Sequence, residues 1–397
     1  MALEGKSALK PGSEMTTPEI LTTALARLVH QAIARAQGWI GFDRFMALAL
    51  YAPGLGYYAN ASRQFGRMPA SGSDFVTGPE LTSLFGQTLA VQVAEALQRT
   101  GTDEIWEFGA GSGALALQLL DALAAMGVPV ARYRIVDLSG TLRARQQETL
   151  ARYTGEAGKV EWLDALPDTM QGVVVGNEVL DAMPVQLLAR VDGSWFERGV
   201  VAEPGGVDNA DAVNGKRAGR WACEDRATGR RPPVDIEGDH DYLTEVHPQA
   251  EAFIATLADR LTRGAAFFID YGFPDSEYYH PQRHMGTVMC HRAHQADGDP
   301  LVDVGLKDIT AHVNFSGIAL AAQSAGLQVL GYCSQARFLL NCGLMARSDQ
   351  ATAAQRALVG HLIHEHEMGE LFKVIGLAVG EPWEAVGFAA GDRTHTL

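Results

Sequence analysis

The chain has 397 residues, 47% of them hydrophobic, and a formal net charge of −15. This composition supports a large buried core, and the negative charge disfavours nonspecific binding to nucleic acid. No apolar run reaches the roughly 18 residues that a membrane span needs. The four cysteines form no Cys-x-x-Cys pair, so we expect reduced thiols in a cytoplasmic protein.

The first quarter of the chain is interpreted as a leader followed by helices. Residues 1–15 lack the apolar core of a signal peptide and are expected to be a disordered leader. Thr16-Thr17-Pro18 provides a helix start, and a second helix is expected from Phe42 to Pro53. Apolar residues recur at helical spacing after Glu80. The sequence therefore predicts a helical N-terminal cap over residues 16–100.

One stretch of this cap is irregular and polar. In GSDFVTGPE at 72–80, glycine and proline interrupt any periodicity, while Asp74, Thr77 and Glu80 supply polar side chains. These side chains have two interpretations. They reach toward a ligand, or Asp74 and Thr77 only satisfy the backbone amides of a capping turn.

Residues 104–120, EIWEFGAGSGALALQLL, predict a strand, a tight turn and a helix. A short apolar run ends in Gly109, Gly111 and Gly113, and leucines at helical spacing follow at once. Glycine suits such a turn because it adopts positive φ and lets a ligand approach the backbone without meeting a Cβ. The segment is typical of a site for a nucleotide-like molecule.

Two cofactor classes fit the glycine spacing. The six residues GAGSGA satisfy the dinucleotide pattern G-x-G-x-x-G/A. Glu107 lies two residues before Gly109, where a carboxylate would repel a pyrophosphate but not the cationic amino acid end of S-adenosylmethionine (SAM). Asp137, at the end of the next strand, suits a ribose diol in either cofactor. A glycine turn without a ligand is the third interpretation.

Polar residues stand at the ends of four successive predicted strands. After the strand that ends in the glycine turn, the strands cover residues 133–137, 160–163 and 172–176. The residues at the four ends are Glu107, Asp137, Asp164, and Asn177 with Glu178. Ligands of open α/β sheets bind beyond the carboxyl ends of the strands, so we expect one shared site. Asp181 follows closely, and its alternative role is to cap the next turn.

The second half of the chain is expected to alternate strands and helices. The expected elements are a hairpin over 185–203, a strand over 265–271, strands over 327–333 and 371–379, and helices over 245–261, 310–325, 335–347 and 351–367. Residues 204–231 are interpreted as a mobile surface insertion, and the long irregular stretch 273–308 as a lid or substrate surface. The histidines do not reproduce a zinc spacing, so no metal is expected.

Several sequence blocks resemble the MidA-like class I methyltransferases, a family that includes a mitochondrial complex I assembly factor. The blocks are GLGYY at 54–58, GSDFVTGPE at 72–80, EFGAGSG at 107–113, NEVLDAMP at 177–184, IDYG at 269–272, GTVMC at 286–290 and DITAHVNF at 308–315. The resemblance implies an α/β, Rossmann-like fold with a mostly parallel seven-stranded sheet and helices on both faces. It also implies a catalytic domain over 101–397, with insertions after the fourth and fifth strands at about 185–245 and 273–308.

The resemblance implies SAM as the cofactor, and the strand ends supply a candidate site. The expected cofactor-binding residues are Asp74, Thr77, Glu80, Glu107, Gly109, Gly111, Gly113, Asp137, Asp164 and Asn177. Glu178 and Asp181, together with Asn177, are the catalytic candidates, because a carboxylate would hold an acceptor guanidinium. Mitochondrial members are associated with methylating an arginine of a respiratory complex I subunit, so the resemblance implies a protein substrate.

Three alternatives stay open at this point. They are an NAD-dependent oxidoreductase, a catalytically idle assembly chaperone that keeps SAM as a structural ligand, and a small-molecule methyltransferase. No nucleic-acid partner is expected. The sequence leaves the oligomeric state open, a dimer included.

Overall fold

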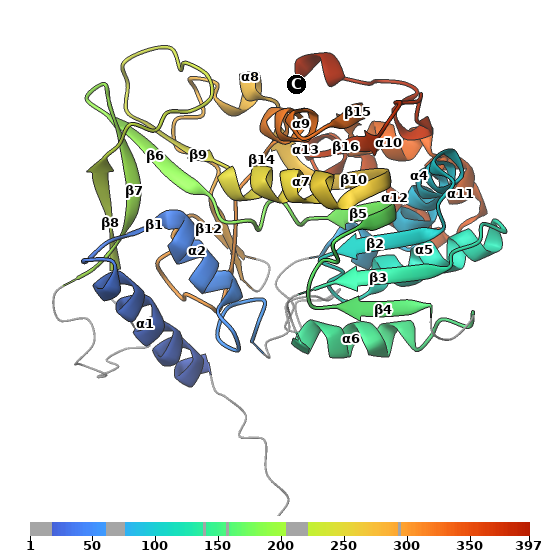
Figure 1. Ribbon diagram of the computed structural model, residues 1–397, viewed down its shortest axis with the longest axis horizontal. Coiled ribbons are helices and arrows are strands. Elements are labelled where there is room, and N and C mark those ends of the chain that lie inside the picture. The colour runs from blue at the N-terminus through green and yellow to red at the C-terminus, as the bar shows by residue number, and fades with distance from the viewer. Residues whose placement is uncertain (1–17, 61–75, 138–139, 156–158, 204–220, 293–294) are drawn as a thin grey trace, which may run out of the picture.

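The computed structural model describes residues 18–60, 76–137, 140–155, 159–203, 221–292 and 295–397. The expected leader over 1–15 and the candidate Asp74 lie outside these residues. A large sheet occupies the right of Figure 1 and a smaller one the left, with a three-stranded sheet in addition. The structure is therefore of the α/β class, with its layers built around the large sheet.

The large sheet has eight strands. In spatial order they are β4 (Val160–Leu163), β3 (Arg132–Val136), β2 (Glu104–Phe108), β5 (Met170–Asn177), β10 (Leu261–Phe273), β16 (Phe372–Val379) and β15 (Leu327–Ser334), with β14 (Val313–Asn314) also beside β10. The strands from β4 to β10 are parallel, and β16 is antiparallel to both of its neighbours. The eighth strand arises because β14 pairs with Gly272 and Phe273, beyond the part of β10 that pairs with β16.

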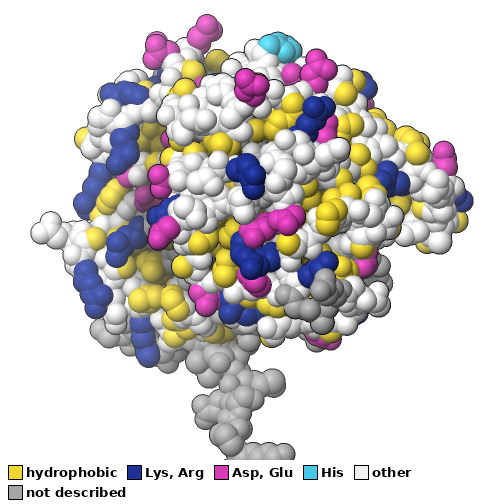
Figure 2. All heavy atoms as spheres, turned by 45° about the vertical axis from the view of Figure 1, so that its right-hand side comes forward, with side chains coloured by type: hydrophobic (Ala, Val, Ile, Leu, Met, Phe, Trp, Pro, Cys, Tyr) yellow, Lys and Arg dark blue, Asp and Glu magenta, His cyan; other side chains and the backbone are white. Residues whose placement is uncertain are grey.

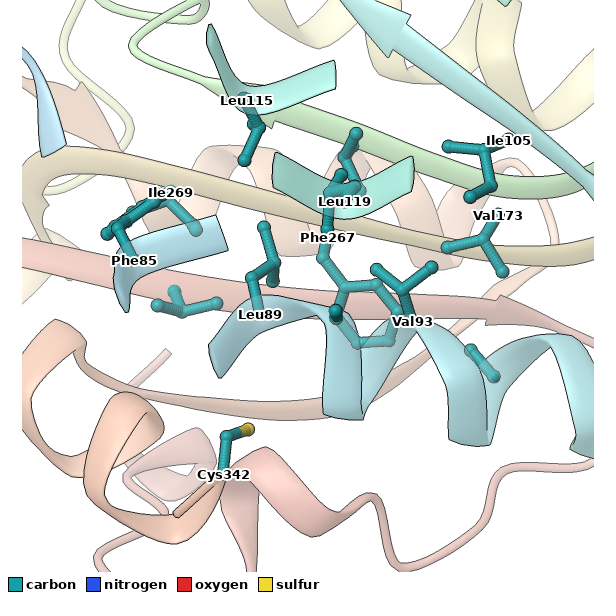
Figure 3. Close-up of a cluster of buried hydrophobic side chains, with 14 of the residues drawn as sticks. Phe85, Leu89, Val93, Ile105, Leu115, Leu119, Val173, Phe267, Ile269 and Cys342 are labelled. Atoms are coloured by element: carbon teal, nitrogen blue, oxygen red, sulfur yellow. The ribbon is translucent and has the colours of Figure 1, made fainter. Parts of the chain in front are cut away.

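Helices α4 (Leu84–Thr100) and α5 (Ala114–Ala125) cover one face of the large sheet. Figure 3 shows Phe85 and Leu89 of α4 meeting Leu119 of α5 and Phe267 of β10 in one buried cluster. The strands β5, β10 and β16 are buried on both faces along most of their length, which explains their largely continuous apolar character. The expected boundary near residue 100 places α4 in the N-terminal cap, but its apolar side chains belong to the core of this sheet.

The opposite face is covered by α7 (Pro248–Arg260) and α9 (Phe315–Ser324). Ile254 and Ile318 of these helices pack with Trp106 and Phe268, which alternate along their strands with residues of the first face. Beside β3 and β4 lies α6 (Gly140–Leu150). This double cover leaves the carboxyl ends of β2, β3, β5 and β10 free to form a site.

Two helices begin later than the sequence indicates. The helix expected over 245–261 begins at Pro248, because β9 (Tyr242–Val246) pairs with a distant strand. The helix expected over 310–325 begins at Phe315, after β13 (Asp308–Thr310) and β14. There the Asn314 side chain caps α9 by accepting a hydrogen bond from the Gly317 N–H at 3.2 Å. Both expectations were wrong at their first residues because strand pairing outweighed local apolar spacing.

The smaller sheet is antiparallel and carries the N-terminal helices. It contains β1 (Ile40–Gly41), β6 (Gln186–Val191), β7 (Ser194–Ala202), β8 (Trp221–Ala227) and β9, and packs with α1 (Pro18–Arg35) and α2 (Phe42–Tyr51). The hairpin expected over 185–203 is confirmed. Its turn residues Asp192 and Gly193 both have positive φ, as a two-residue hairpin turn requires. Of the insertion expected to be irregular over 204–231, residues 204–220 lie outside the described residues, and residues 221–227 form β8 by pairing with β7.

The stretch 273–308 is more ordered than expected. It contains α8 (Asp275–Tyr278), and β11 (Met289–Arg292) pairs with β12 (Gln295–Asp297) and with β13. The helix expected over 335–347 is divided into α10 (Gln335–Asn341) and α11 (Leu344–Gln350). The helix expected over 351–367 corresponds to α12 (Ala353–Ile363), and the short α13 (Met368–Leu371) follows it. Gly343, with a φ of 84°, separates α10 from α11.

The remaining elements are short. They are α3 (Gly78–Leu81) and the 3-10 turns η2 (Val386–Phe388) and η3 (Thr394–Thr396). Within the described ranges, no helix combines the length and apolarity needed to cross a lipid bilayer. On the face shown in Figure 2, acidic, basic and apolar side chains are interspersed.

Candidate active site

A cavity of about 1060 Å³ lies at the carboxyl ends of β2, β3, β5 and β10. The candidate residues that line it are Thr77, Glu80, Glu107, Gly109, Gly111, Asp137, Asp164, Asn177, Glu178 and Asp181. Gly113 is not among the lining residues, and Asp74 lies outside the described ranges. The parallel sheet therefore brings side chains from four strand ends into one space.

The glycine turn is held tightly against its neighbours. Gly109 and Gly111 have φ values of 62° and 52°, and a Cβ on Gly109 would lie 3.0 Å from Val179. Gly113 has a φ of 82°, and a Cβ there would lie 3.2 Å from the Gln146 Cα. The lack of a side chain at Gly113 therefore lets α5 pack closely against α6. The other two leave backbone open to the cavity at the start of α5.

Gln146 was missed by the sequence analysis, and it links Asp137 to the glycine turn. Its Nε2 donates to the Asp137 carboxylate at 2.7 Å and to the Gly111 carbonyl at 3.2 Å. The Trp162 indole donates to its Oε1 at 2.9 Å. Because Gln146 is fully buried, these bonds fix the Asp137 side chain beside the glycine turn. A glutamine inside a polar helix gives no local signal of this role.

Glu107 is a buried acid at the base of the cavity. It is 2% exposed, and the Tyr133 hydroxyl donates to its Oε2 at 2.6 Å. Burial raises the pKa of Glu107 to about 8, the Tyr133 hydrogen bond lowers it, and the nearby Asp137 raises it further. A cationic group placed here would favour the ionised carboxylate, whereas an anionic group would not.

The 77–80 turn packs against the glycine turn. Ser112 donates to the Glu80 carboxylate, and Gln118 donates to the Pro79 carbonyl at 2.8 Å. Thr77 precedes α3 but makes no side-chain capping bond, so the structure does not support its interpretation as a turn cap. At the other end, Asp164 accepts from Arg143 at 2.5 Å and is mostly exposed.

The catalytic candidates lie on a turn that a single carboxylate organises. After β5 ends at Asn177, Glu178 takes a φ of 55°, an unusual conformation for a residue with a side chain. The N–H groups of Val179, Leu180 and Asp181 then converge on one oxygen of Asp270, at 3.1, 2.9 and 3.2 Å. Asp270 therefore binds three amides of this turn, and the Asp181 carboxylate itself accepts backbone hydrogen bonds from Ala182 and from its own N–H, in line with its alternative role as a turn cap. The place of Asp270 at the end of β10 was a usable signal that the sequence analysis did not take up.

Glu178 and Asp181 are two neighbouring acids that line the cavity. Asn177 donates to Glu178 at 2.8 Å; burial raises the pKa of Glu178 to about 8, and Asp181 raises it further. Asp181 is 4% exposed, and burial raises its pKa to about 6 although Tyr271 donates to it. Its Oδ1 has no hydrogen-bond partner among the described residues. A buried acceptor without a partner is unfavourable, so this oxygen suits a donor on a ligand.

Three residues from distant parts of the chain complete the acidic end. The Tyr51 hydroxyl donates to the Ala182 carbonyl at 2.8 Å, and the Tyr58 hydroxyl donates to Asp308 at 2.9 Å. The two tyrosine rings stack with centroids 5.6 Å apart. Tyr58 and Asp308 lie in blocks that carried the family resemblance, but no role for them followed from the sequence.

No metal site is evident in the part of the chain that the structure describes. It holds no group of three or more His, Cys, Asp or Glu side chains placed to bind a metal ion. Cys290, Cys333 and Cys342 are buried free thiols, and Cys223 is an exposed one.

The fold and the cavity define an α/β enzyme that binds a nucleoside cofactor with a cationic end. Comparison with known proteins makes this specific: residues 88–333 match Methyltransf_28, the S-adenosyl-L-methionine-dependent methyltransferase family. The match covers more than half of the chain, and the chain belongs to this family. It is therefore a SAM-dependent methyltransferase of the MidA-like group, and SAM is its cofactor.

Solved structures and curated relatives agree with this assignment. A COG1565 superfamily protein of Burkholderia thailandensis, solved with bound S-adenosyl-homocysteine, is 49% identical with a TM-score of 0.89, over 98% of this chain and 100% of that one. The mitochondrial protein arginine methyltransferase NDUFAF7 homolog of Caenorhabditis elegans is 29% identical over 98% of this chain and 95% of its own. The human mitochondrial protein arginine methyltransferase NDUFAF7 is 26% identical over 90% and 83%.

Proposed function

We propose that the enzyme transfers the methyl group of SAM to a terminal nitrogen of an arginine side chain in a protein. The observation that carries the proposal is the Oδ1 of buried Asp181, which has no hydrogen-bond partner among the described residues and lies close to Glu178 in the cavity that the glycine turn also lines. Relatives named protein arginine methyltransferases support the same acceptor. A respiratory complex I subunit is the protein substrate that the family resemblance suggests.

The acids supply what a guanidinium acceptor needs. When bound, SAM supplies an electrophilic methyl group on a sulfonium. Glu178 and Asp181 accept hydrogen bonds from the N–H groups of the acceptor, which localises positive charge away from the attacking nitrogen. The nitrogen lone pair forms the new N–C bond as the C–S pair leaves with sulfur, and a carboxylate takes the proton that the nitrogen loses. Alignment of the two groups supplies much of the acceleration, up to about 7–11 kcal/mol in favourable systems.

We also assign the large sheet to the class I methyltransferase arrangement. The order from β4 to β15 supports seven strands of that type, with β14 as an addition. In this assignment the smaller sheet and the 273–308 segment are insertions after the fourth and fifth strands. They supply the acceptor side of the cavity, because β13 carries Asp308.

The first prediction concerns Glu178→Gln. We expect methyl incorporation from labelled SAM into arginine-containing peptides and cell-extract proteins to fall about 10²–10⁴-fold, since the amide cannot take a proton. Amino acid analysis of the labelled product identifies methylarginine. Binding of S-adenosyl-homocysteine should change by less than about twofold, because Glu107 and the glycine turn are intact.

The matched control is Glu381→Gln, which changes an exposed acid far along the chain and should leave methyl transfer unchanged. Full transfer by Glu178→Gln with the cofactor still bound removes Glu178 from the chemistry. Label that enters only small molecules favours a small-molecule methyltransferase. Tight cofactor binding with no methylated product in any extract favours the assembly chaperone.

A further inference from the structure

The wall of the cavity beyond Tyr271 is basic and aromatic. The Arg283 guanidinium lies 3.8 Å from the centroid of the Phe273 ring, and Lys373 Nζ lies 5.5 Å from the same centroid. The His312 ring centroid is 5.1 Å from that of Phe273 and 5.3 Å from that of Tyr271. Arg283, Tyr271 and His312 all line the cavity. This wall therefore has the opposite character from the acidic end.

Arg283 is the cation of this wall that is available to a ligand. Lys373 donates to the Glu370 and Leu371 carbonyls, whereas Arg283 has no salt bridge and no side-chain hydrogen bond to any residue the structure describes. Burial lowers the pKa of His312 to about 4, and Arg283 and Lys373 lower it further, so the histidine is neutral. The guanidinium thus stacks on one ring with its five N–H donors unused.

A short path of side chains joins the two ends. Tyr271 donates to Asp181 and contacts His312, His312 contacts Phe273, and Phe273 carries Arg283. Each step is close to 5 Å or shorter between the groups that it joins. An extended peptide advances roughly 3.3 Å per residue, so about four residues cover this path.

Exposed apolar side chains lie near Arg283 along the chain and in the lining of the cavity. Met285, two residues further, is 78% exposed, while Met289 and Leu371 are 40% and 49% exposed and both line the cavity. Apolar side chains at a cavity rim with a cation among them suit an amphipathic stretch of a protein chain. The substrate is therefore expected to enter past Arg283 before its acceptor reaches Asp181.

We propose that Arg283 is a specificity-determining subsite that binds a carboxylate side chain of the acceptor protein, within about four residues of the methylated arginine. This inference rests on the proposed function. The acidic end of the cavity and Arg283 at the other end would together fix the direction of the peptide. In a reversed peptide, the substrate arginine would meet Arg283 and the substrate carboxylate would meet the acids, so like charges would repel. The carboxylate of SAM itself is the other source to test, but we expect the cofactor at the β2 end, where Glu107 and the glycine turn line the cavity.

The test uses synthetic peptides with one central arginine and a single Asp or Asn at each flanking position out to four residues. Both methyl incorporation and peptide binding to the protein saturated with S-adenosyl-homocysteine are measured. We expect wild type to prefer Asp over Asn about tenfold at one position. Arg283→Glu should lose that preference and gain one of similar size for Lys at the same position.

Arg226→Glu is the matched control, because Arg226 also stacks on a ring, that of Trp39 at 5.0 Å, but does not line the cavity. It should keep the wild-type preference. Methylation without any Asp preference, or a preference that survives in Arg283→Glu, overturns the subsite. A third outcome also overturns the subsite: Arg283→Glu binds S-adenosyl-homocysteine more weakly but keeps the peptide preference. In that case the carboxylate that Arg283 binds is that of the cofactor.

The binding measurement separates this inference from the proposed function. Asp-dependent binding without methyl transfer supports the subsite and contradicts the proposed arginine acceptor. Arginine methylation that does not depend on flanking charge supports the proposed arginine acceptor and contradicts the subsite. Absence of binding by every peptide contradicts both.

Discussion

Among single residues, Glu107 shows most directly how burial prepares the cavity for its cofactor. Its raised pKa of about 8 means that the protonated form dominates at neutral pH in the free protein. We propose that the cationic amino acid end of SAM lies against Glu107. It would stabilise the ionised form, and binding would then displace a proton. The local sequence predicted the acid, but the size of its pKa shift depends on Tyr133 and Asp137, which β3 brings alongside.

We predict that SAM binding releases close to one proton at pH 7 and that its affinity rises as pH increases from 6 to 8. The amino group of the ligand stays protonated over most of this range, since α-amino groups have a pKa of about 7.7–8.0. Calorimetry in buffers of different ionisation enthalpy measures the proton count. Glu107→Gln should abolish the release and flatten the pH dependence; a release of the same size in this variant would assign the proton to another group.

The same shift has a consequence for folding. Because the folded-state pKa of Glu107 lies above its usual 4.5, the stabilising contribution of the protonated acid is complete below about pH 4.5. It is lost as pH rises toward 8. The pKa of Glu178 is also raised to about 8, so its ionisation lowers the stability of the folded state over the same pH range. The two acids that would bind cations in the cavity therefore make the free protein less stable in alkaline solution.

At the scale of elements, the turn between β5 and β6 depends on the end of another strand. Glu178 donates its N–H to the Ile269 carbonyl at 2.9 Å, and the next three amides bind Asp270. The sequence analysis placed Glu178 correctly at a strand end, because a continuous apolar run marks where β5 stops. It could not show what holds the turn, since β10 is about 90 residues away along the chain.

We predict that Asp270→Ala lowers the free energy of unfolding by about 3 kcal/mol, because buried N–H groups left without an acceptor are costly at about 1–3 kcal/mol each. Asp270→Asn keeps an acceptor oxygen and removes one of several crowded acids. The free energy of unfolding of this variant should therefore fall by no more than about 1 kcal/mol. Denaturant unfolding measures both. An alanine variant as stable as wild type would show that water replaces the carboxylate and that Asp270 does not position the turn.

Other elements show the same division between local and distant causes. The hairpin at Asp192-Gly193 was predictable because two adjacent residues determine its turn. The strand β8 was not, because its charged sequence gains strand structure only from the free edge of β7. The start of α9 at Phe315 was missed for a related reason, since β14 forms only where β10 continues past β16.

At the scale of the whole molecule, the cavity is formed between the two halves of Figure 1. The large sheet supplies the glycine turn and the acids at its strand ends. Helix α2 on the smaller sheet supplies Tyr51, and the turn after it supplies Tyr58; their hydroxyls donate to the Ala182 carbonyl and to Asp308. Closing the cavity therefore requires both sheets to be folded and docked.

We predict that S-adenosyl-homocysteine at 100 times its dissociation constant raises the free energy of unfolding by about 2.7 kcal/mol, because it binds only the folded protein. Unfolding in denaturant should show one transition that moves as a unit, since the ligand site depends on both sheets. NADH at the same concentration is the control and should have no effect. Stabilisation of one of two separate transitions would mean that the halves fold independently.

The sequence by itself determined the α/β class, the glycine turn with its upstream acid, and the polar residues Asp137, Asn177 and Glu178 at strand ends. These follow from short-range patterns, because strand ends in a parallel sheet share one edge and glycine marks positive φ locally. Only the tertiary structure decided that Gly113 packs against Gln146, that Asp270 holds the catalytic turn, and that Tyr58, Asp308 and Arg283 join the cavity. Those contacts join residues tens to hundreds of positions apart, and a local pattern carries no record of which distant side chain will arrive beside it.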